Sequence, residues 1–208
     1  MSPASKSVAK HAVRIIAGQY RRRLLPVVAA DGLRPTPERV RQTVFNWLEH
    51  QLGGHWAGVH ALDLFAGTGA LGLEAASRGA ASVLLCEQNP AAARQLQASV
   101  ALLGASACTV RPRDALAVLN GLPSSAVNLL FLDPPFGAGW LEKLSTPCQR
   151  VLADGALVYI ESESPLLVPH LVPLLMPPVN TGLWGNFALL RTVKAGAVHA
   201  SLLKYERL

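Results

Sequence analysis

An apolar run that begins at Val127 ends in four consecutive residues: Asp133, Pro134, Pro135 and Phe136. The two prolines remove backbone donors and stiffen the chain, which leaves the Asp133 carboxylate and the Pro134 carbonyl as fixed acceptors. Both can accept hydrogens from one exocyclic amino group, while the Phe136 ring offers a face on which a nucleobase can stack. The tetrapeptide therefore predicts group transfer to a base nitrogen, with catalysis mostly by positioning. The alternative interpretation is a proline-rich turn after a buried strand.

A glycine-rich turn follows an earlier apolar run. Its glycines, Gly67, Gly69 and Gly72, let the backbone pass close to a ligand, and with Glu87 they also match a dinucleotide-binding pattern. Asp63 at the mouth of the run argues against a dinucleotide, because its charge would face an anionic pyrophosphate. The same charge suits the amino group and sulfonium of S-adenosylmethionine. The turn therefore predicts this methyl donor as the cofactor.

Two further acids follow apolar runs. Glu87 is placed to accept hydrogen bonds from both ribose hydroxyls, since each carboxylate oxygen has spare lone pairs; the alternative is a surface carboxylate. Asp114 suits either the adenine edge or the N-cap of the next helix. The residues predicted to bind the cofactor are Asp63, Phe65, Ala66, Gly67, Gly69, Glu87, Gln88, Asp114 and Ala115.

These residues need a parallel sheet to bring them together. From residue 61 onward, short apolar runs alternate with helical patterns, which is typical of a doubly wound α/β fold. Strands are predicted at residues 61–65, 82–87, 109–111, 127–133 and 156–162. Helices are predicted at residues 70–78, 90–103, 115–120 and 140–152, with Asn89 and Pro90 as a cap and first turn.

Two hairpins complete the predicted architecture. Residues 187–194 and 198–205 are expected to close the sheet edge as antiparallel strands, giving a mostly parallel seven-stranded Rossmann-like sheet. Residues 13–17 and 22–28 predict a small N-terminal hairpin turned at Gly18. A helix should begin at Thr36-Pro37, with Thr36 as its cap, and bury Val40, Val44 and either Trp47 or Leu48.

Positive charge is concentrated at the N-terminus. Residues 1–41 contain nine of the nineteen Lys and Arg residues and two acids, so they carry +7, whereas the rest of the chain carries −1. Such an arm is expected where one face neutralises phosphates. We expect a flexible basic tail over residues 1–12, a hairpin-and-helix cap over 13–50 and a methyltransferase domain over 51–208.

Other chemistry is not indicated. Three widely spaced cysteines, without a Cys-x-x-Cys pair, predict ordinary half-buried thiols, and the six histidines show no convincing ligand spacing, so no metal is expected. The apolar stretch 166–179 is interrupted by prolines and is too short to span a bilayer. The N-terminus lacks the apolar core of a secretory signal. The sequence thus predicts a cytoplasmic monomer that does not contact membranes.

Five segments carry a family resemblance: residues 14–21 (RIIAGQYR), 32–48 (GLRPTPERVRQTVFNWL), 61–72, 133–136 and 159–163 (YIESE). Through them the chain resembles the bacterial 16S ribosomal RNA guanine-N2 methyltransferases over about residues 13–205. The resemblance implies that residues 133–136 receive a flipped guanine of 16S rRNA, in the small ribosomal subunit or an assembly intermediate. The chain departs from the family pattern in having a longer N-terminal tail and a proline-rich loop at 165–178. This loop could alter RNA docking or bind another protein.

The resemblance also implies residues that hold the RNA or the cofactor from the N-terminal side: Arg14, Arg21, Arg22, Arg23, Arg34, Thr36 and Arg39. For Arg39 and its neighbour Arg41, a solvated helix face is the open alternative. The rival functions are an adenine-N6 methyltransferase acting on DNA or RNA, a non-catalytic RNA-binding assembly factor, and a nicotinamide-dependent oxidoreductase.

Overall fold

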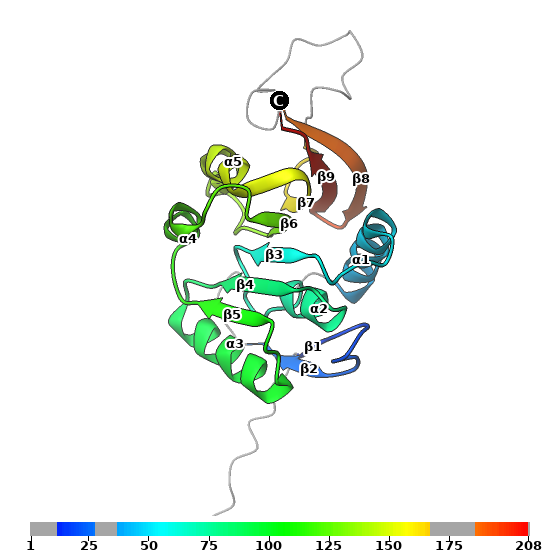
Figure 1. The fold of residues 1–208 in the computed structure, drawn as a ribbon, viewed down its shortest axis with the longest axis vertical. Coiled ribbons are helices and arrows are strands. Elements are labelled where there is room, and N and C mark those ends of the chain that lie inside the picture. The colour runs from blue at the N-terminus through cyan, green and yellow to red at the C-terminus, as the bar shows by residue number, and fades with distance from the viewer. Residues whose placement is uncertain (1–11, 28–36, 167–185, 208) are drawn as a thin grey trace, which may run out of the picture.

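A computed structural model of the protein describes residues 12–27, 37–166 and 186–207, and a seven-stranded sheet forms its centre (Figure 1). The strands of this sheet are β3 (His60–Asp63), β4 (Ser82–Cys86), β5 (Cys108–Arg111), β6 (Val127–Leu132), β7 (Leu152–Ser162), β8 (Phe187–Ala195) and β9 (Val198–Tyr205). Their order across the sheet is β5-β4-β3-β6-β7-β9-β8. The first five in that order run parallel, whereas β9 runs antiparallel to both of its neighbours, β7 and β8. The predicted doubly wound, mostly parallel sheet is confirmed.

Helices cover both faces of the sheet and bury two apolar cores. The first core contains residues of α1 (Glu38–Leu52), α2 (Gly72–Ser77) and α3 (Pro90–Leu103). The second contains residues of α4 (Ala115–Gly121) and α5 (Trp140–Val151). In Figure 1, α4 and α5 accordingly lie together on one side of the strands, opposite α1 and α2.

Helix boundaries follow the local capping chemistry. The Asn89 side chain accepts hydrogen bonds from the backbone amides of Ala91 and Ala92, so α3 begins at Pro90 as predicted. Gly104 ends the same helix in the left-handed conformation, with φ of 61°. The interior helices and strands therefore lie within a few residues of their predicted positions, except that β7 begins four residues early, at Leu152.

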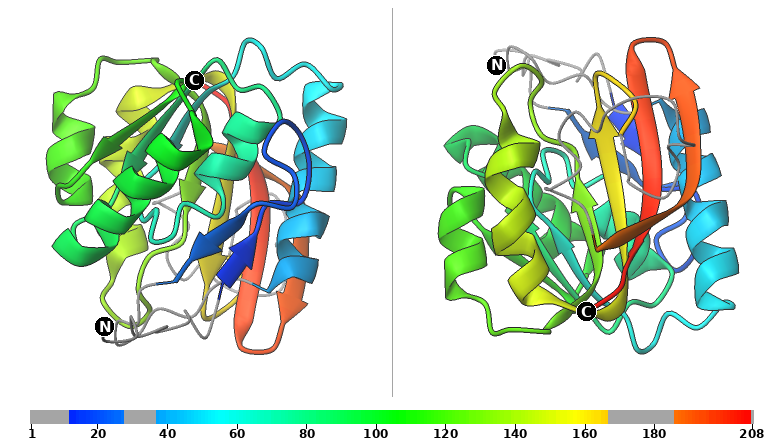
Figure 2. Two further views of the ribbon diagram at one scale, coloured as in Figure 1. Left: turned by 90° about the horizontal axis from the view of Figure 1, so that it is seen from below. Right: turned by 90° about the horizontal axis from the view of Figure 1, so that it is seen from above.

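A separate two-stranded sheet, β1 (Ala12–Arg14) and β2 (Leu24–Pro26), forms the N-terminal hairpin. Figure 2 shows its turn beside α2, with α1 next to it. The turn lies at Gly18 as predicted, but both strands are shorter than predicted. The backbone amides of Ile16 and Ala17 donate to the Glu74 side chain, so these residues leave the strand ladder.

The helix predicted after Thr36 is α1, which begins at Glu38 with Pro37 as its N-cap; Thr36 lies outside the described residues. The predicted stripe of Val40, Val44 and Leu48 is buried. A solvated face is wrong for Arg41, because this side chain is only 2% exposed.

Several expectations concern residues that the structure does not describe. Almost all of the predicted tail and of the proline-rich loop is outside the described ranges, and the three-part division of the chain stays a prediction. Among the described residues, Cys86 and Cys148 are buried rather than half-buried, Cys108 is half-buried, and all three are free thiols. No described helix is long and apolar enough to cross a membrane.

Candidate active site

The predicted site residues gather along the edge where the parallel strands end. Asp63 is the last residue of β3, and Asp133 follows β6, the strand that pairs with β3. The strand order runs outward in one direction from β3 to β5 and in the other from β6 to β7, so it reverses between β3 and β6. Ligands of open α/β sheets bind at such a switch point. Glu87 and Asp114 follow β4 and β5, so they continue the same edge.

The glycine loop packs too closely for side chains. Gly67 and Gly69 have φ of 51° and 81°, a region that favours glycine. A Cβ on Gly69 would lie 2.5 Å from Leu96, and one on Gly72 would lie 2.2 Å from Leu85. Gly69 is therefore required for packing against α3, and Gly72 for packing against β4.

Asp63 is a buried carboxyl that orders this loop. One of its oxygens accepts a hydrogen bond of 3.0 Å from the Gly72 amide at the start of α2, and the residue is 2% exposed. Burial raises the pKa of Asp63 to about 7, and nearby Glu87 adds to the rise, against the lowering effect of the Gly72 and Phe65 amides. A cationic group beside Asp63 would favour its ionised form.

The other two acids of this edge also bind backbone. Glu87 accepts from the Gly67 amide at 2.9 Å through one oxygen and from the Asn89 amide at 2.7 Å through the other. Each oxygen keeps a second lone pair, so the predicted ribose contact is compatible with this geometry. Asp114 caps α4 through one oxygen, which accepts from the amides of Leu116 and Ala117. The predicted cap is confirmed, and the adenine contact stays a prediction.

The tetrapeptide after β6 combines buried and exposed parts. Asp133 is half-buried and Pro134 is buried, whereas Pro135 is exposed. The Phe136 side chain is 43% exposed, which is unusual for a large apolar residue in this protein. An exposed ring beside a rigid carboxylate is the arrangement that base stacking requires. Phe65, after β3, packs edge to face on Trp140 of α5 at 5.4 Å between centroids.

The chain has close relatives. A family model described as conserved hypothetical protein 95 matches residues 13–175. The chain is 45% identical over 155 residues to ribosomal RNA small subunit methyltransferase D of Escherichia coli (strain K12), covering 73% of this chain and 75% of that protein. It belongs to the ribosomal RNA small subunit methyltransferase D family. A solved structure, the putative methyltransferase yhhF from Escherichia coli, superposes with a TM-score of 0.74 and 37% identity, covering 94% of this chain and 99% of that one.

Membership of the methyltransferase D family confirms the expected class I methyltransferase, and S-adenosylmethionine is its cofactor. A more distant neighbour shares the fold: an RNA methyltransferase from Salinibacter ruber in complex with S-adenosyl-L-homocysteine, with 18% identity, a TM-score of 0.57, and 84% of this chain and 95% of that one covered. The site fits the cofactor, because a close-packed glycine loop faces carboxylates and Asp63 is poised to ionise beside a cation.

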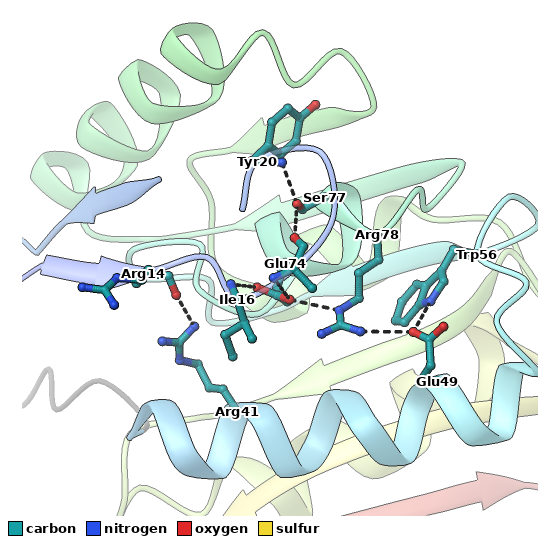
Figure 3. A network of polar contacts seen from close by, with 10 residues as sticks. Arg14, Ile16, Tyr20, Arg41, Glu49, Trp56, Glu74, Ser77 and Arg78 are labelled. Carbon is teal, nitrogen blue, oxygen red and sulfur yellow. Dashed lines mark hydrogen bonds and ion pairs between the residues drawn. The ribbon is translucent and has the colours of Figure 1, made fainter. Parts of the chain in front are cut away.

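In this member of the family, the N-terminal hairpin is fastened to the helix that follows the cofactor loop (Figure 3). The buried Glu74 side chain of α2 accepts the amides of Ile16 at 2.6 Å and Ala17 at 3.0 Å, and it pairs with Arg78 at 2.9 Å. Ser77 of α2 accepts the Tyr20 amide and donates to the Ala17 carbonyl. The short α2 therefore contacts the cofactor loop at one end and the hairpin along its length.

The predicted RNA-binding arginines fall into two groups. Arg14, Arg21, Arg22, Arg23 and Arg39 are exposed, as phosphate contacts require, while Arg34 and Thr36 lie outside the described residues. The Arg41 guanidinium, on α1, donates at 2.9 Å to the carbonyl of Arg14 (Figure 3). Arg41 therefore fixes the backbone of the hairpin and leaves the exposed arginines to face solvent.

The sequence pattern indicates no role for two buried acids, Glu74 and Glu161. Glu161, near the end of β7, is 3% exposed, and its carboxylate accepts a hydrogen bond of 2.7 Å from the Tyr159 hydroxyl. The sequence does contain a pattern that could have pointed to Glu161, because this acid interrupts an apolar strand at the same edge as Asp133. For Glu74 the sequence offers only the i,i+4 spacing to Arg78, since the two hairpin amides that it binds lie 57 and 58 residues away in the chain.

Proposed function

We propose that the protein transfers a methyl group from S-adenosylmethionine to the exocyclic N2 of a specific guanine in 16S ribosomal RNA of the small subunit. The observation that carries this proposal is the position of residues 133–136 beside the end of β3, where the cofactor loop begins. The names of the relatives, which refer to small-subunit ribosomal RNA, support the substrate.

In this proposal the cofactor lies across the ends of β3, β4 and β5. Asp63 faces its cationic groups, the backbone around Gly67 and Gly69 lies along it, and Glu87 accepts from its ribose. Phe65, Ala66, Gln88, Asp114 and Ala115 complete its surroundings. When bound, the cofactor supplies a methyl group activated by a positive sulfonium, which is a good leaving group.

The protein's own contribution is to aim the base nitrogen. Asp133 and the Pro134 carbonyl accept the two hydrogens of the amino group, and Phe136 stacks on the extruded base. Pro135 adds rigidity, because it fixes its own φ. As the nitrogen gains a methyl group it must lose a proton, and the Asp133 carboxylate is the acceptor nearest to it.

The RNA is held by charge on the N-terminal side. The exposed arginines of the hairpin and of α1 neutralise phosphates, and their attachment to α2 keeps them at a fixed position relative to the cofactor loop. We infer that the protein acts as a cytoplasmic monomer on RNA within the small subunit or its assembly intermediate.

The proposal is tested by methyl transfer from labelled S-adenosylmethionine to three substrates: small ribosomal subunits that lack the modification, free 16S rRNA and duplex DNA. We expect label in ribosomal RNA only, and its loss in Asp133→Ala with cofactor affinity within about twofold of the wild type. Glu163→Gln is the matched control, because Glu163 is an exposed acid near the same edge and should retain activity. Label in DNA, or full activity of Asp133→Ala, would contradict the proposal.

A further inference from the structure

The carboxyl edge of the sheet carries one acid for each parallel strand. In spatial order from β5 to β7 these acids are Asp114, Glu87, Asp63, Asp133 and Glu161. The first three fall where the proposed function places the cofactor, and the fourth where it places the target amino group. Glu161 extends the same row by one strand, on the side of the target base that faces away from the cofactor.

Strand register places Glu161 next to Asp133. Leu132 of β6 pairs with Ile160 of β7, so the next residue on each strand is Asp133 and Glu161. Neighbouring strands lie about 4.8 Å apart. Tyr159 belongs to the same apolar core as Phe131, and side chains alternate between faces along a strand, so Glu161 lies on that face of the sheet. Asp133 follows the last residue of β6 and lies close enough to Tyr159 to help raise the pKa of its hydroxyl.

Tyr159 holds the Glu161 carboxylate in place. The Tyr159 hydroxyl donates to one Glu161 oxygen at 2.7 Å, while the Tyr159 ring packs on Phe131 at 6.3 Å. Burial, together with Glu161 and then Asp133, raises the pKa of Tyr159 well above its usual value, so the hydroxyl remains a donor. A carboxylate has about four acceptor positions, so Glu161 can accept a further hydrogen bond from a ligand.

Two carboxylates side by side complement one base edge in particular. Guanine presents its N2 amino group and its N1–H as adjacent donors, whereas adenine presents an amino group beside N1, which is an acceptor. A fixed carboxylate next to Asp133 therefore attracts N1–H of guanine and repels the lone pair of adenine N1. Sites built to hydrogen-bond an N–H reject analogues that lack it.

We propose that Glu161 is a specificity-determining residue that accepts a hydrogen bond from N1–H of the extruded guanine, with Tyr159 as its positioning residue. This inference rests on the proposed function, because it presumes that Asp133 binds the N2 amino group. It assigns the choice of guanine over adenine to the end of β7, one strand away from the residues that bind the reacting nitrogen.

The test uses 2-aminopurine, which keeps the 2-amino group but lacks N1–H. The guanine that the wild-type protein methylates is first located in 16S rRNA, and is then replaced by 2-aminopurine in ligated RNA reconstituted into small subunits. We expect the wild type to prefer guanine in kcat/KM by on the order of a thousandfold. Because 2-aminopurine also lacks O6, the informative quantity is the change of this preference between variants.

In Glu161→Gln we expect kcat on guanine to fall about a hundredfold, with KM for the RNA within about threefold, because phosphate contacts dominate RNA affinity. The preference for guanine should fall to about tenfold or less, since an amide can also donate to the unprotonated N1 of 2-aminopurine. Tyr159→Phe should give an intermediate preference, and Glu163→Gln should match the wild type. Cofactor affinity and circular dichroism establish that each variant is folded.

An unchanged preference for guanine in Glu161→Gln, whatever its rate, would overturn the inference. A merely structural role would lower kcat/KM for guanine and for 2-aminopurine by the same factor. If Glu161→Gln does not fold, the preference of Tyr159→Phe decides by the same criterion. If the wild-type product is N2-methylguanosine but the variants keep the wild-type preference, only the role of Glu161 is rejected. A wild-type product other than N2-methylguanosine rejects the proposed function as well.

Discussion

At the scale of single residues, buried acids hold the backbone around the site. Asp63 accepts from the Gly72 amide and Glu87 from the Gly67 amide, so the two carboxylates fix the cofactor loop at its end and its beginning. Glu74 fixes the hairpin in the same way. A carboxylate that is buried away from water needs hydrogen-bond donors to offset its lost hydration. Because these donors are backbone amides, each carboxylate also fixes the backbone conformation around it.

Glu74 offers a stability prediction. The carboxylate is fully buried, and it binds two hairpin amides and Arg78, so Glu74→Gln should lower the free energy of unfolding by about 3 kcal/mol. Glu49→Gln is the matched control, because Glu49 pairs with the same Arg78 but its side chain is 46% exposed. Glu49→Gln should lower the free energy of unfolding by less than about 1 kcal/mol. Urea denaturation measures both, and equal losses would contradict the role of Glu74.

Asp63 leads to a prediction about pH. Its pKa of about 7 means that the carboxyl is largely protonated below pH 7 in the cofactor-free protein. A cationic ligand favours the ionised form, so binding at low pH must release this proton. Affinity for S-adenosylmethionine should therefore fall as pH decreases below about 7, approaching tenfold per pH unit.

Isothermal titration calorimetry from pH 5.5 to 8.5 measures this dependence, with the range chosen to lie about 1.5 units on either side of the expected value. Asp63→Asn should bind more weakly at pH 8 and lose the dependence. A wild type with constant affinity, or an Asn variant with the same slope, would show that Asp63 does not face the cationic groups of the cofactor.

The sequence was informative about residues whose role depends on their position at a strand end. Asp63, Glu87 and Asp133 could be found because each acid ends or follows an apolar run. The burial of Arg41 could not be predicted, since its partner is a hairpin carbonyl 27 residues away and its neighbour Arg39 is exposed. Tertiary contacts of this kind have no local pattern.

At the scale of secondary-structure elements, the close fit of the hairpin turn against α2 is the most sensitive contact. Gly18 has φ of 77°, and a Cβ there would lie 1.8 Å from the Ser77 carbonyl oxygen. We predict that Gly18→Ala detaches the hairpin and weakens binding of small-subunit RNA at least tenfold, or about 1.4 kcal/mol, while cofactor affinity changes little. Filter binding and calorimetry measure the two affinities.

Gly58→Ala is the control for this substitution, because nothing lies within 4 Å of a Cβ at Gly58. It should leave both affinities unchanged. An RNA affinity of Gly18→Ala equal to that of Gly58→Ala would mean that the docked hairpin does not contribute to RNA binding.

Elements were predictable where their ends carry local signals. The helix α3 is bracketed by Asn89 and Gly104, and both of its ends follow from the sequence. The N-terminal strands were predicted too long, because the amides of Ile16 and Ala17 bind Glu74 of a distant helix. The apolar pattern of a hairpin gives no information about such a competing acceptor.

At the scale of the whole molecule, charge is distributed unevenly, and this yields a prediction about salt. Replacing Arg21, Arg22 and Arg23 with Gln lowers the formal charge from +6 to +3. If each binds a phosphate, the slope of log affinity against log salt concentration should decrease in magnitude by about 2 to 3. The measurement is RNA affinity at several salt concentrations.

The matched control removes three exposed charges from β8 and β9, at the end of the sheet away from β5: Arg191, Lys194 and Lys204. That variant has the same net charge, so its slope should remain near the wild-type value. Equal slopes for the two triple variants would indicate that net charge, rather than the hairpin, attracts the RNA.

The most direct test of the account is the identity of the methylated nucleoside. Small ribosomal subunits that lack the modification are incubated with the protein and labelled S-adenosylmethionine, and the RNA is digested to nucleosides for mass spectrometry. We predict N2-methylguanosine at one site in 16S rRNA. Methyladenosine would contradict the guanine assignment while keeping the fold and the cofactor, and the absence of any methylated nucleoside would contradict the proposed activity itself.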